Sequence, residues 1–163
     1  MFGFFKKKKK ELSLYAVCDG CVKNIDKVND PVFADKIMGD GYAIAPESGK
    51  VSVSSPVKGR VMSVFPTKHA ITFLTDEGIE SLIHMGIDTV ALNGEGFSVF
   101  VKEGDTVDAN TIIAEMDVDY ISRQGKDTDI IIVFTNLENA QHVELTSTSG
   151  VKRGQSIGLI PLN

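Results

Sequence analysis

The sequence predicts an all-β fold: a compact antiparallel β-sandwich or barrel with one or two short helical turns. Its apolar runs are short, and Gly, Pro, Asp and Asn interrupt them about every 8–12 residues, a cadence typical of sandwiches and barrels. A V-K-x-G-like stretch recurs at residues 57–61, 101–107 and 151–157 and predicts a turn between strands each time. With 163 residues and 42% hydrophobic content, the chain is long enough for one domain with its own core.

The expected strands are short runs of β-branched, aliphatic and aromatic residues bounded by turn residues. In chain order they are Leu14–Val17, Val22–Asn24, Gly41–Pro46, Lys50–Ser54, Gly59–Val64, Ala70–Thr75, Ile79–Met85, Phe97–Val101, Thr111–Asp117, Asp129–Phe134, Gln141–Leu145 and Ser156–Leu162. Two stretches, Pro31–Met38 and Val118–Gln124, predict one-turn helices.

We expect residues 1–12 to form a flexible basic tail and residues 13–163 to form the folded domain. The tail joins Met-Phe-Gly-Phe-Phe to lysines at positions 6–10, whereas a secretory signal has its charge first and a longer apolar region after it. No apolar stretch reaches the about 18 residues needed to span a membrane. We therefore expect a cytoplasmic protein. The tail is either solvated or in weak peripheral contact with the anionic inner face of the membrane.

Charge and cysteine content narrow the class of function. The net charge is −5 despite the lysine run, so the folded part is acidic, which argues against nucleic acid and suits a basic protein partner. Cys18 and Cys21 are the only cysteines, and a zinc site would need a second ligand pair, while a redox motif would need a thioredoxin-like setting. The sequence offers neither, so we interpret Asp19-Gly20 as a turn between two incidental thiols.

Two histidines flank one predicted β-hairpin. His69 begins its first arm, His84 ends its second, and the turn residues Thr-Asp-Glu-Gly lie between. If the loop has an even number of residues, position i pairs with position 153 minus i, and His69 lies directly opposite His84 on one sheet face. A three-residue loop would instead place Met85 opposite His69. Gly86 is expected to end the second strand and to expose backbone N–H groups.

Three chemical interpretations of this pair remain open at this point. A neutral His84 is a nucleophile for a phosphoryl group, with the second imidazole donating a hydrogen bond to the phosphoryl oxygens. Alternatively, both imidazoles bind zinc, for which a further ligand would have to come from a carboxylate or a partner. The third interpretation is two ordinary half-buried sheet residues. Thr67 is placed to form a hydrogen bond with His69. The sequence suggests no second histidine or other functional side chain beside His142.

The segments at residues 30–41, 55–59, 67–70, 83–90 and 93–97 resemble the glucose-family enzyme IIA domain of the bacterial sugar phosphotransferase system. The resemblance covers about residues 14–162. Its most specific part is the block His84-Met85-Gly86-Ile87-Asp88-Thr89-Val90, with a histidine fifteen residues earlier. Pro31 and Met38 depart from the aliphatic residues more usual in the family.

The resemblance implies that His84 is phosphorylated, that His69 supports it, and that Thr67 is bonded nearby. It implies transfer from the phosphocarrier HPr to the IIB domain of a membrane sugar transporter, with no required cofactor and with zinc only at a partner interface through His69 and His84. A non-catalytic module that reports phosphorylation state to other enzymes or permeases is the alternative. The residues that the resemblance assigns to the partner surface are Asp30, Val32, Ile37, Met38, Phe65, Leu82, Asp88 and Val90.

Overall fold

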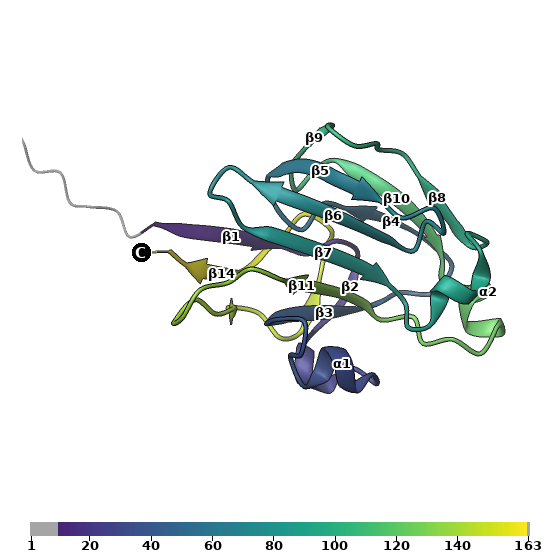
Figure 1. Ribbon diagram of the computed structural model, residues 1–163. Helices are drawn as coiled ribbons and strands as arrows, with labels where there is room; N and C mark the ends of the chain where they lie inside the picture. Colours follow the sequence, from purple (N-terminus) through teal and green to yellow (C-terminus); the bar gives the residue numbers. More distant parts are fainter. Residues whose placement is uncertain (1–9, 163) are drawn as a thin grey trace, which may run out of the picture.

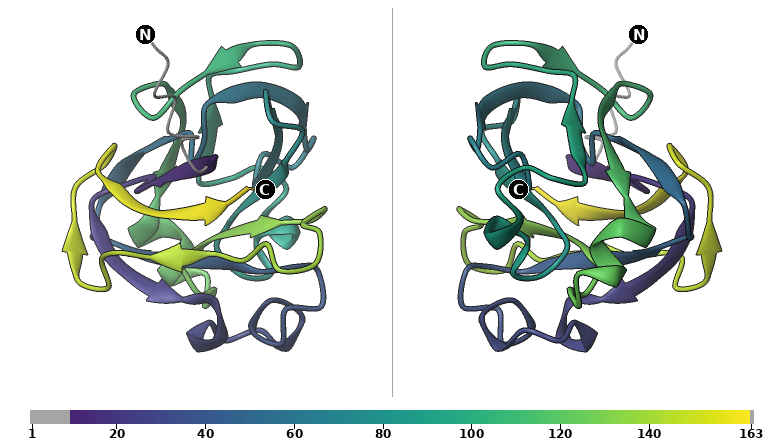
Figure 2. Two further views of the ribbon diagram at one scale, coloured as in Figure 1. Left: turned by 90° about the vertical axis from the view of Figure 1, so that its left-hand side faces the viewer. Right: turned by 90° about the vertical axis from the view of Figure 1, so that its right-hand side faces the viewer.

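A computed structural model describes residues 10–162 and confirms the all-β class (Figure 1). Its strands form three antiparallel sheets around one main core, which the two end-on views of Figure 2 show surrounded by strands. Within residues 10–162, no helix is long and apolar enough to cross a membrane.

The largest sheet has eight strands and carries both histidines of the predicted hairpin. In spatial order its strands are β13 (Gly150–Val151), β2 (Gly20–Asn24), β3 (Gly41–Pro46), β11 (Ile130–Phe134), β7 (Glu80–Met85), β6 (Ala70–Thr75), β5 (Gly59–Val64) and β9 (Thr106–Val107). Strand β11 reads Ile-Ile-Ile-Val-Phe and is buried along its whole length. Both faces of the sheet are therefore covered at its centre.

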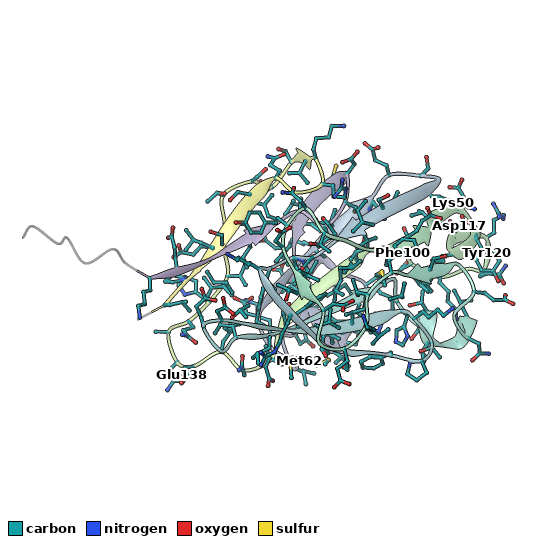
Figure 3. The ribbon with its side chains drawn as sticks, turned by 90° about the horizontal axis from the view of Figure 1, so that it is seen from above. Lys50, Met62, Phe100, Asp117, Tyr120 and Glu138 are labelled. Atoms are coloured by element: carbon teal, nitrogen blue, oxygen red, sulfur yellow. The ribbon has the colours of Figure 1, made fainter. Side chains whose placement is uncertain are left out.

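Two three-stranded sheets close the main core. One has the order β1 (Glu11–Tyr15), β14 (Ser156–Pro161), β12 (Glu144–Leu145), and the other has the order β4 (Lys50–Ser54), β10 (Ile112–Asp117), β8 (Phe97–Val99). Lys50 and Asp117 pair across β4 and β10 and lie together at one end of the molecule, next to Tyr120 (Figure 3). The large side chains that fill the core, all fully buried, include Leu14, Ile71, Phe73, Ile83, Ile113 and Met116.

Helix α1 (Pro31–Ala34) lies outside the eight-stranded sheet, beside β3 (Figure 1). Asp30 caps it by accepting a hydrogen bond from the Val32 backbone N–H at 2.9 Å, and proline stands in its first turn. A second small core joins α1 and the 3-10 helix η1 (Ile25–Lys27) to the outer face of this sheet. Its buried members are Ile25, Val28, Phe33, Ala43, Ile87, Ile131 and Val133. The remaining helices are α2 (Val118–Arg123) and η2 (Thr89–Leu92).

All twelve predicted strands are present at least in part, and four have the predicted bounds: Gly41–Pro46, Lys50–Ser54, Gly59–Val64 and Ala70–Thr75. The expected boundary at residue 13 is too late, because β1 begins at Glu11 and the buried Leu12 in it pairs with Ile160 of β14. Residues 1–9 of the expected tail lie outside the described residues. The helix expected to end at Met38 ends at Ala34, and Lys36 has a left-handed φ of 58°, which does not continue a helix.

Two of the three V-K-x-G-like stretches are turns of the same build. Gly104 and Gly154 have φ values of 90° and 86°, and in each turn the lysine backbone N–H donates to a side chain three residues later. The first stretch is different, because Gly59 lies within β5, where a Cβ would meet the Leu74 carbonyl oxygen. There the chain bends at residues 56–58, between β4 and β5, so the change of direction comes before the glycine. The short strands β9 and β13, next to the two true turns, were not predicted.

Candidate active site

His84 lies near the end of β7, on the sheet face that α1 covers. It pairs with Ala70 of β6 on one side and with Ile131 of β11 on the other. Its Nδ1 is 2.7 Å from the backbone oxygen of Gly86. A carbonyl oxygen only accepts, so Nδ1 carries the proton and Nε2 keeps a free lone pair. The geometry therefore makes Nε2 the nucleophilic atom of this side chain.

Gly86 holds this carbonyl in place through its own backbone. Its φ is 79°, and a Cβ there would lie 2.5 Å from Thr89 Cγ2 and 2.9 Å from the Asp127 oxygen, so only glycine fits. Its N–H donates to the Asp129 oxygen at 2.9 Å. The prediction that Gly86 leaves its N–H exposed is therefore wrong. This bond ties the carbonyl that orients His84 to the strand next to β7.

The loop between β6 and β7 has three residues, which shifts the predicted register by one. The Thr75 N–H donates to the Ile79 oxygen at 3.0 Å, and Gly78 within the loop has a φ of 86°. A left-handed glycine at the last position is the usual way to close such a loop. The even-numbered loop assumed first is wrong, and the three-residue alternative is confirmed.

This register puts Met85, not His84, opposite His69. The Met85 N–H donates to the His69 oxygen at 2.8 Å. The two imidazole rings are still in contact, with centroids 4.8 Å apart and planes at 80°. Contact is possible because His69 lies in a bend before β6, next to Lys68 with a φ of 62°, so strand alternation does not apply to it. The predicted pair exists, but a bend rather than cross-strand pairing makes it.

Thr67 bonds His69 as the sequence predicts. Its Oγ1 is 2.7 Å from His69 Nδ1. A hydroxyl both donates and accepts, so this contact permits either neutral tautomer of His69. When Thr67 donates, the His69 proton lies on Nε2, the nitrogen available to a group bound at His84.

Four rings form a continuous row through the site. Phe65 meets His69 edge-on at 5.5 Å, His69 meets His84 at 4.8 Å, and His84 meets Phe33 of α1 at 5.2 Å. Phe33 is 6% exposed, whereas Phe65 is 39% exposed. The row of rings therefore runs from the buried Phe33 of α1 to the exposed Phe65.

Burial keeps both imidazoles neutral at pH 7. Burial of the side chain, with a smaller contribution from His84, lowers the pKa of His69 to about 4. Burial also lowers the pKa of His84, and the Gly86 carbonyl and the carboxylates of Asp30 and Asp88 oppose this only in part. A neutral imidazole is the form that can act as a nucleophile.

Exposed apolar side chains stand on the segments around the histidines. Of the seven large exposed apolar side chains within residues 10–162, five were predicted for the partner surface. We call these five, Val32, Ile37, Met38, Phe65 and Val90, the apolar rim. Leu82 is only 7% exposed, because it lies within the central part of β7, so its assignment to an accessible surface is wrong. Asp30 caps α1 and Asp88 precedes η2.

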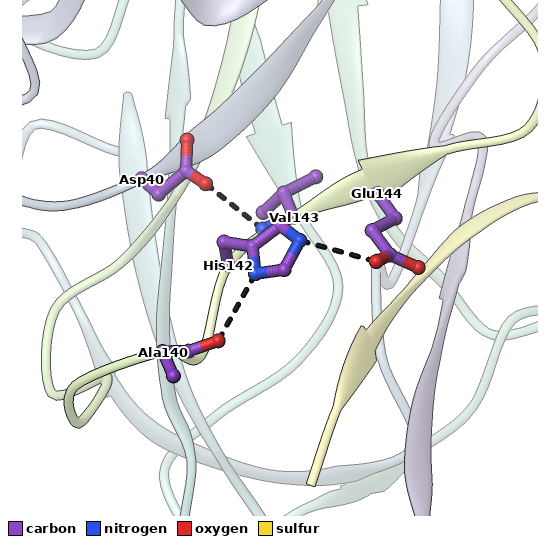
Figure 4. A network of polar contacts seen from close by, with 5 residues as sticks. All are labelled: Asp40, Ala140, His142, Val143 and Glu144. Atoms are coloured by element: carbon purple, nitrogen blue, oxygen red, sulfur yellow. Dashed lines mark hydrogen bonds and ion pairs between the residues drawn. The ribbon is translucent and has the colours of Figure 1, made fainter.

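The other predicted chemistry-bearing residues stand apart from this site. His142 contacts the Ala140 oxygen and Glu144, and the neighbouring Val143 N–H donates to Asp40 (Figure 4). Cys18 is buried, which raises the pKa of its thiol to about 12, and Cys21 is exposed. Within residues 10–162, no group of three His, Cys, Asp or Glu side chains could hold a metal ion.

Two groups that contribute to the site were not predicted from the sequence. The buried ring of Phe33 comes from a segment fifty residues away from His84, and no local pattern connects them. The Gly86 carbonyl acts through the backbone, and its only sequence signal is a glycine two positions after the histidine.

Comparisons with known proteins agree on one family. The family model described as phosphoenolpyruvate-dependent sugar phosphotransferase system, EIIA 1, matches residues 12–140. The PTS system glucose-specific EIIA component of Staphylococcus aureus is 40% identical over 156 residues, which are 96% of this chain and 93% of that protein. The PTS system glucose-specific EIICBA component of Streptococcus pneumoniae is 42% identical over 149 residues, 91% of this chain but only 20% of that longer protein. The structure of glucose permease IIA from Mycoplasma capricolum superposes with a TM-score of 0.85 at 34% identity, covering 98% of this chain and 99% of that one.

Proposed function

The chain belongs to the EIIA 1 family of the phosphoenolpyruvate-dependent sugar phosphotransferase system, and on that premise we propose that it is a phosphohistidine carrier. It accepts a phosphoryl group from phospho-HPr on Nε2 of His84 and passes the group to the IIB domain of a sugar transporter. The observation that carries this proposal is the bond from His84 Nδ1 to the Gly86 oxygen, which leaves Nε2 free beside a second imidazole.

In the first transfer, the bond between phosphorus and the donor nitrogen of HPr breaks as the bond to His84 Nε2 forms. The proton stays on Nδ1 and remains hydrogen-bonded to the Gly86 carbonyl oxygen, so the positive charge that develops on the ring is stabilised by a fixed acceptor. His69, with its proton on Nε2 and Thr67 donating to its Nδ1, donates to a phosphoryl oxygen. The second transfer reverses the roles, since the imidazole of His84 then becomes the leaving group.

The surface around the site suits a brief encounter with a basic protein. The apolar rim offers contact area without a deep pocket, and the carboxylates of Asp30 and Asp88 lie close enough to act on the charge of His84. Attraction between opposite charges raises the rate of association, while a small apolar contact allows fast release. Both properties are needed by a protein that must bind a donor and an acceptor in turn.

The proposal also covers where the protein acts and whether it binds zinc. We place the carrier in the cytoplasm, where its phosphoryl donor is, with weak membrane contact through the N-terminal tail. No cofactor is needed for the transfer. The two imidazoles supply at most two of the four ligands of a tetrahedral zinc ion, so zinc binding at this site would draw a further ligand from a partner.

Phosphorylation of purified protein tests the proposal. We expect the chain to gain one acid-labile phosphoryl group when it is incubated with phosphoenolpyruvate, the first enzyme of the system and HPr, as measured by mass spectrometry at neutral pH. His84→Ala should abolish the gain and leave the fold intact. His142→Gln is the matched control, because His142 is exposed and its hydrogen bonds go to Ala140 and Glu144, away from the two paired histidines. Label on His84→Ala would overturn the assignment, and binding of HPr without any transfer would favour the regulatory alternative.

A further inference from the structure

We infer that Lys68 is a positioning residue whose left-handed backbone turns the His69 ring onto His84. The inference rests on the proposed function, because it assigns the residue that brings the supporting imidazole to the phosphorylated one. It concerns the backbone of Lys68 and not its charge.

The hydrogen bonds of the hairpin show that His69 departs from the strand pattern. Because the Met85 N–H donates to the His69 oxygen, a regular continuation of β6 would point the side chain of His69 to the same face as Met85. Met85 and Ile71 are both fully buried in the main core. His84 is on the other face of β7, yet the His69 ring contacts it. The backbone before β6 must therefore rotate the side chain from one face to the other.

Lys68 supplies this rotation. The chain between β5 and β6 turns within residues 65–70, where the Lys68 N–H donates to the Phe65 oxygen at 2.8 Å and the Phe65 N–H donates to the Ala70 oxygen at 3.0 Å. Within this turn Lys68 has a φ of 62°, a region that residues other than glycine, asparagine and aspartate rarely adopt. A residue held in an unfavourable conformation next to a functional side chain is a candidate for a functional constraint.

The alternative is that the Lys68 ammonium group acts directly on the phosphoryl group. Its side chain runs beside Gly94, where Lys68 Cδ would lie 3.6 Å from a Cβ built on that glycine, and the side chain is exposed. Substitutions separate the two roles. Glycine and asparagine remove the charge but adopt a positive φ easily, whereas valine removes the charge and resists it.

The first measurement needs no phosphoryl transfer. We expect nitrogen-15 NMR titration of the unphosphorylated protein to give His69 a pKa of about 4 in the native chain and in Lys68→Gly and Lys68→Asn. In Lys68→Val the pKa should rise toward 6.5, because the ring leaves its buried place beside His84. Lys68→Thr, which is also branched at Cβ but polar, gives the same readout if Lys68→Val does not fold.

The second measurement is rapid-quench transfer to the IIB domain. Lys68→Gly and Lys68→Asn should retain the native rate within about twofold, and Lys68→Val should be slower by about tenfold or more, as expected when a supporting group is misplaced. The matched control is Ala140→Val, since Ala140 also has a positive φ, of 71°, but lies by His142 and away from the site. It should lose stability without losing transfer.

The outcomes are distinct. An unchanged His69 pKa and transfer rate in Lys68→Val would overturn the inference. An equal loss of transfer in all three variants, with the His69 pKa unchanged, would also overturn it and assign the effect to charge. If the native chain accepts no phosphoryl group, the proposed function fails, but the titration still decides whether Lys68 positions His69.

Discussion

The two histidines differ in what their Nδ1 atoms contact, and this difference separates their roles. Nδ1 of His84 faces a carbonyl oxygen, which fixes one tautomer, while Nδ1 of His69 faces the Thr67 hydroxyl, which permits two. A fixed tautomer suits the atom that forms the bond to phosphorus. An adjustable one suits a group that must support the phosphoryl group in both directions.

We expect His69→Gln to accept a phosphoryl group from HPr but to deliver it to the transporter roughly 10²-fold more slowly. Glutamine keeps an N–H donor for the bound group, but it cannot take up the positive charge that helps when negative charge develops on the phosphoryl oxygens. Rapid-quench measurement of both half-reactions tests this. Equal loss in both, or loss in neither, would contradict the supporting role.

Stability should fall as the pH is lowered from 7 to 5. In the unfolded chain His69 titrates near its ordinary 6.5, whereas in the folded chain its pKa is about 4, so the unfolded state binds the proton first. Between these two values, each pH unit should remove about 1.4 kcal/mol from the free energy of unfolding. His84, whose pKa is lowered too, adds to the loss in the same direction.

Urea unfolding at several pH values measures this effect, and His69→Gln is the control because it lacks this titration. Its free energy of unfolding should decline less between pH 7 and pH 5 than that of the native chain. Parallel declines in the two proteins would mean that burial does not hold His69 neutral.

At this scale, the residue types around the predicted hairpin identified the histidine pair, whereas the five residues of the apolar rim came from the resemblance to a known family. The sequence could not identify Phe33 or the Gly86 carbonyl. The first depends on how α1 packs on the sheet, and the second is a backbone group. It also misjudged Leu82, since exposure depends on which segments cover a strand.

At the scale of elements, the strands were predictable because their apolar residues are bounded by turn residues. The register was not, because it depends on whether the loop after Thr75 has two residues or three. That difference reverses the face of every side chain in one strand relative to the other. The two histidines still meet in spite of the shifted register, because His69 lies in a bend before β6 and not in the strand itself.

Two left-handed glycines of this hairpin should respond differently to alanine. Gly78 in the loop has no atom near its missing Cβ, so Gly78→Ala should lower the free energy of unfolding by about 1 kcal/mol through backbone strain alone. Gly86→Ala adds a clash with Thr89 and the Asp127 oxygen, and we expect a loss of about 3 kcal/mol. Urea unfolding gives both values.

The Gly78→Ala and Gly86→Ala variants also separate an effect on stability from an effect on function. Gly86→Ala should also slow phosphate acceptance, because the carbonyl that orients His84 must move, whereas Gly78→Ala should accept phosphate at the native rate. A Gly86→Ala variant with native transfer would show that this carbonyl does not orient the nucleophile.

At the scale of the whole molecule, the site and the two ends of the described residues 10–162 lie at opposite ends of one hairpin. The loop residues Glu77 and Gly78 border a cavity together with Lys10 and Leu162, so this end of the hairpin adjoins both ends of the described residues. His84 lies at the other end of β7, which has six residues and therefore spans roughly 20 Å. Figure 1 shows β1 beginning, and β14 ending, on the side away from the arrowhead of β7.

The last prediction is that the N-terminal tail adds weak adhesion to anionic vesicles and has no part in phosphate transfer. Phe2, Phe4 and Phe5 precede five lysines, and apolar insertion and charge attraction are each marginal alone. Co-sedimentation should show full-length protein bound at low salt. Binding should weaken as screening shortens to about 8 Å at physiological ionic strength.

The matched variants begin at Glu11, the first residue of β1, or replace the three phenylalanines with serine and keep the lysines. Both should lose vesicle binding and keep native phosphate acceptance. Equal vesicle binding by all three proteins would show that the tail is only a solvated leader. Loss of phosphate acceptance in the shortened chain would instead make the tail part of the transfer unit.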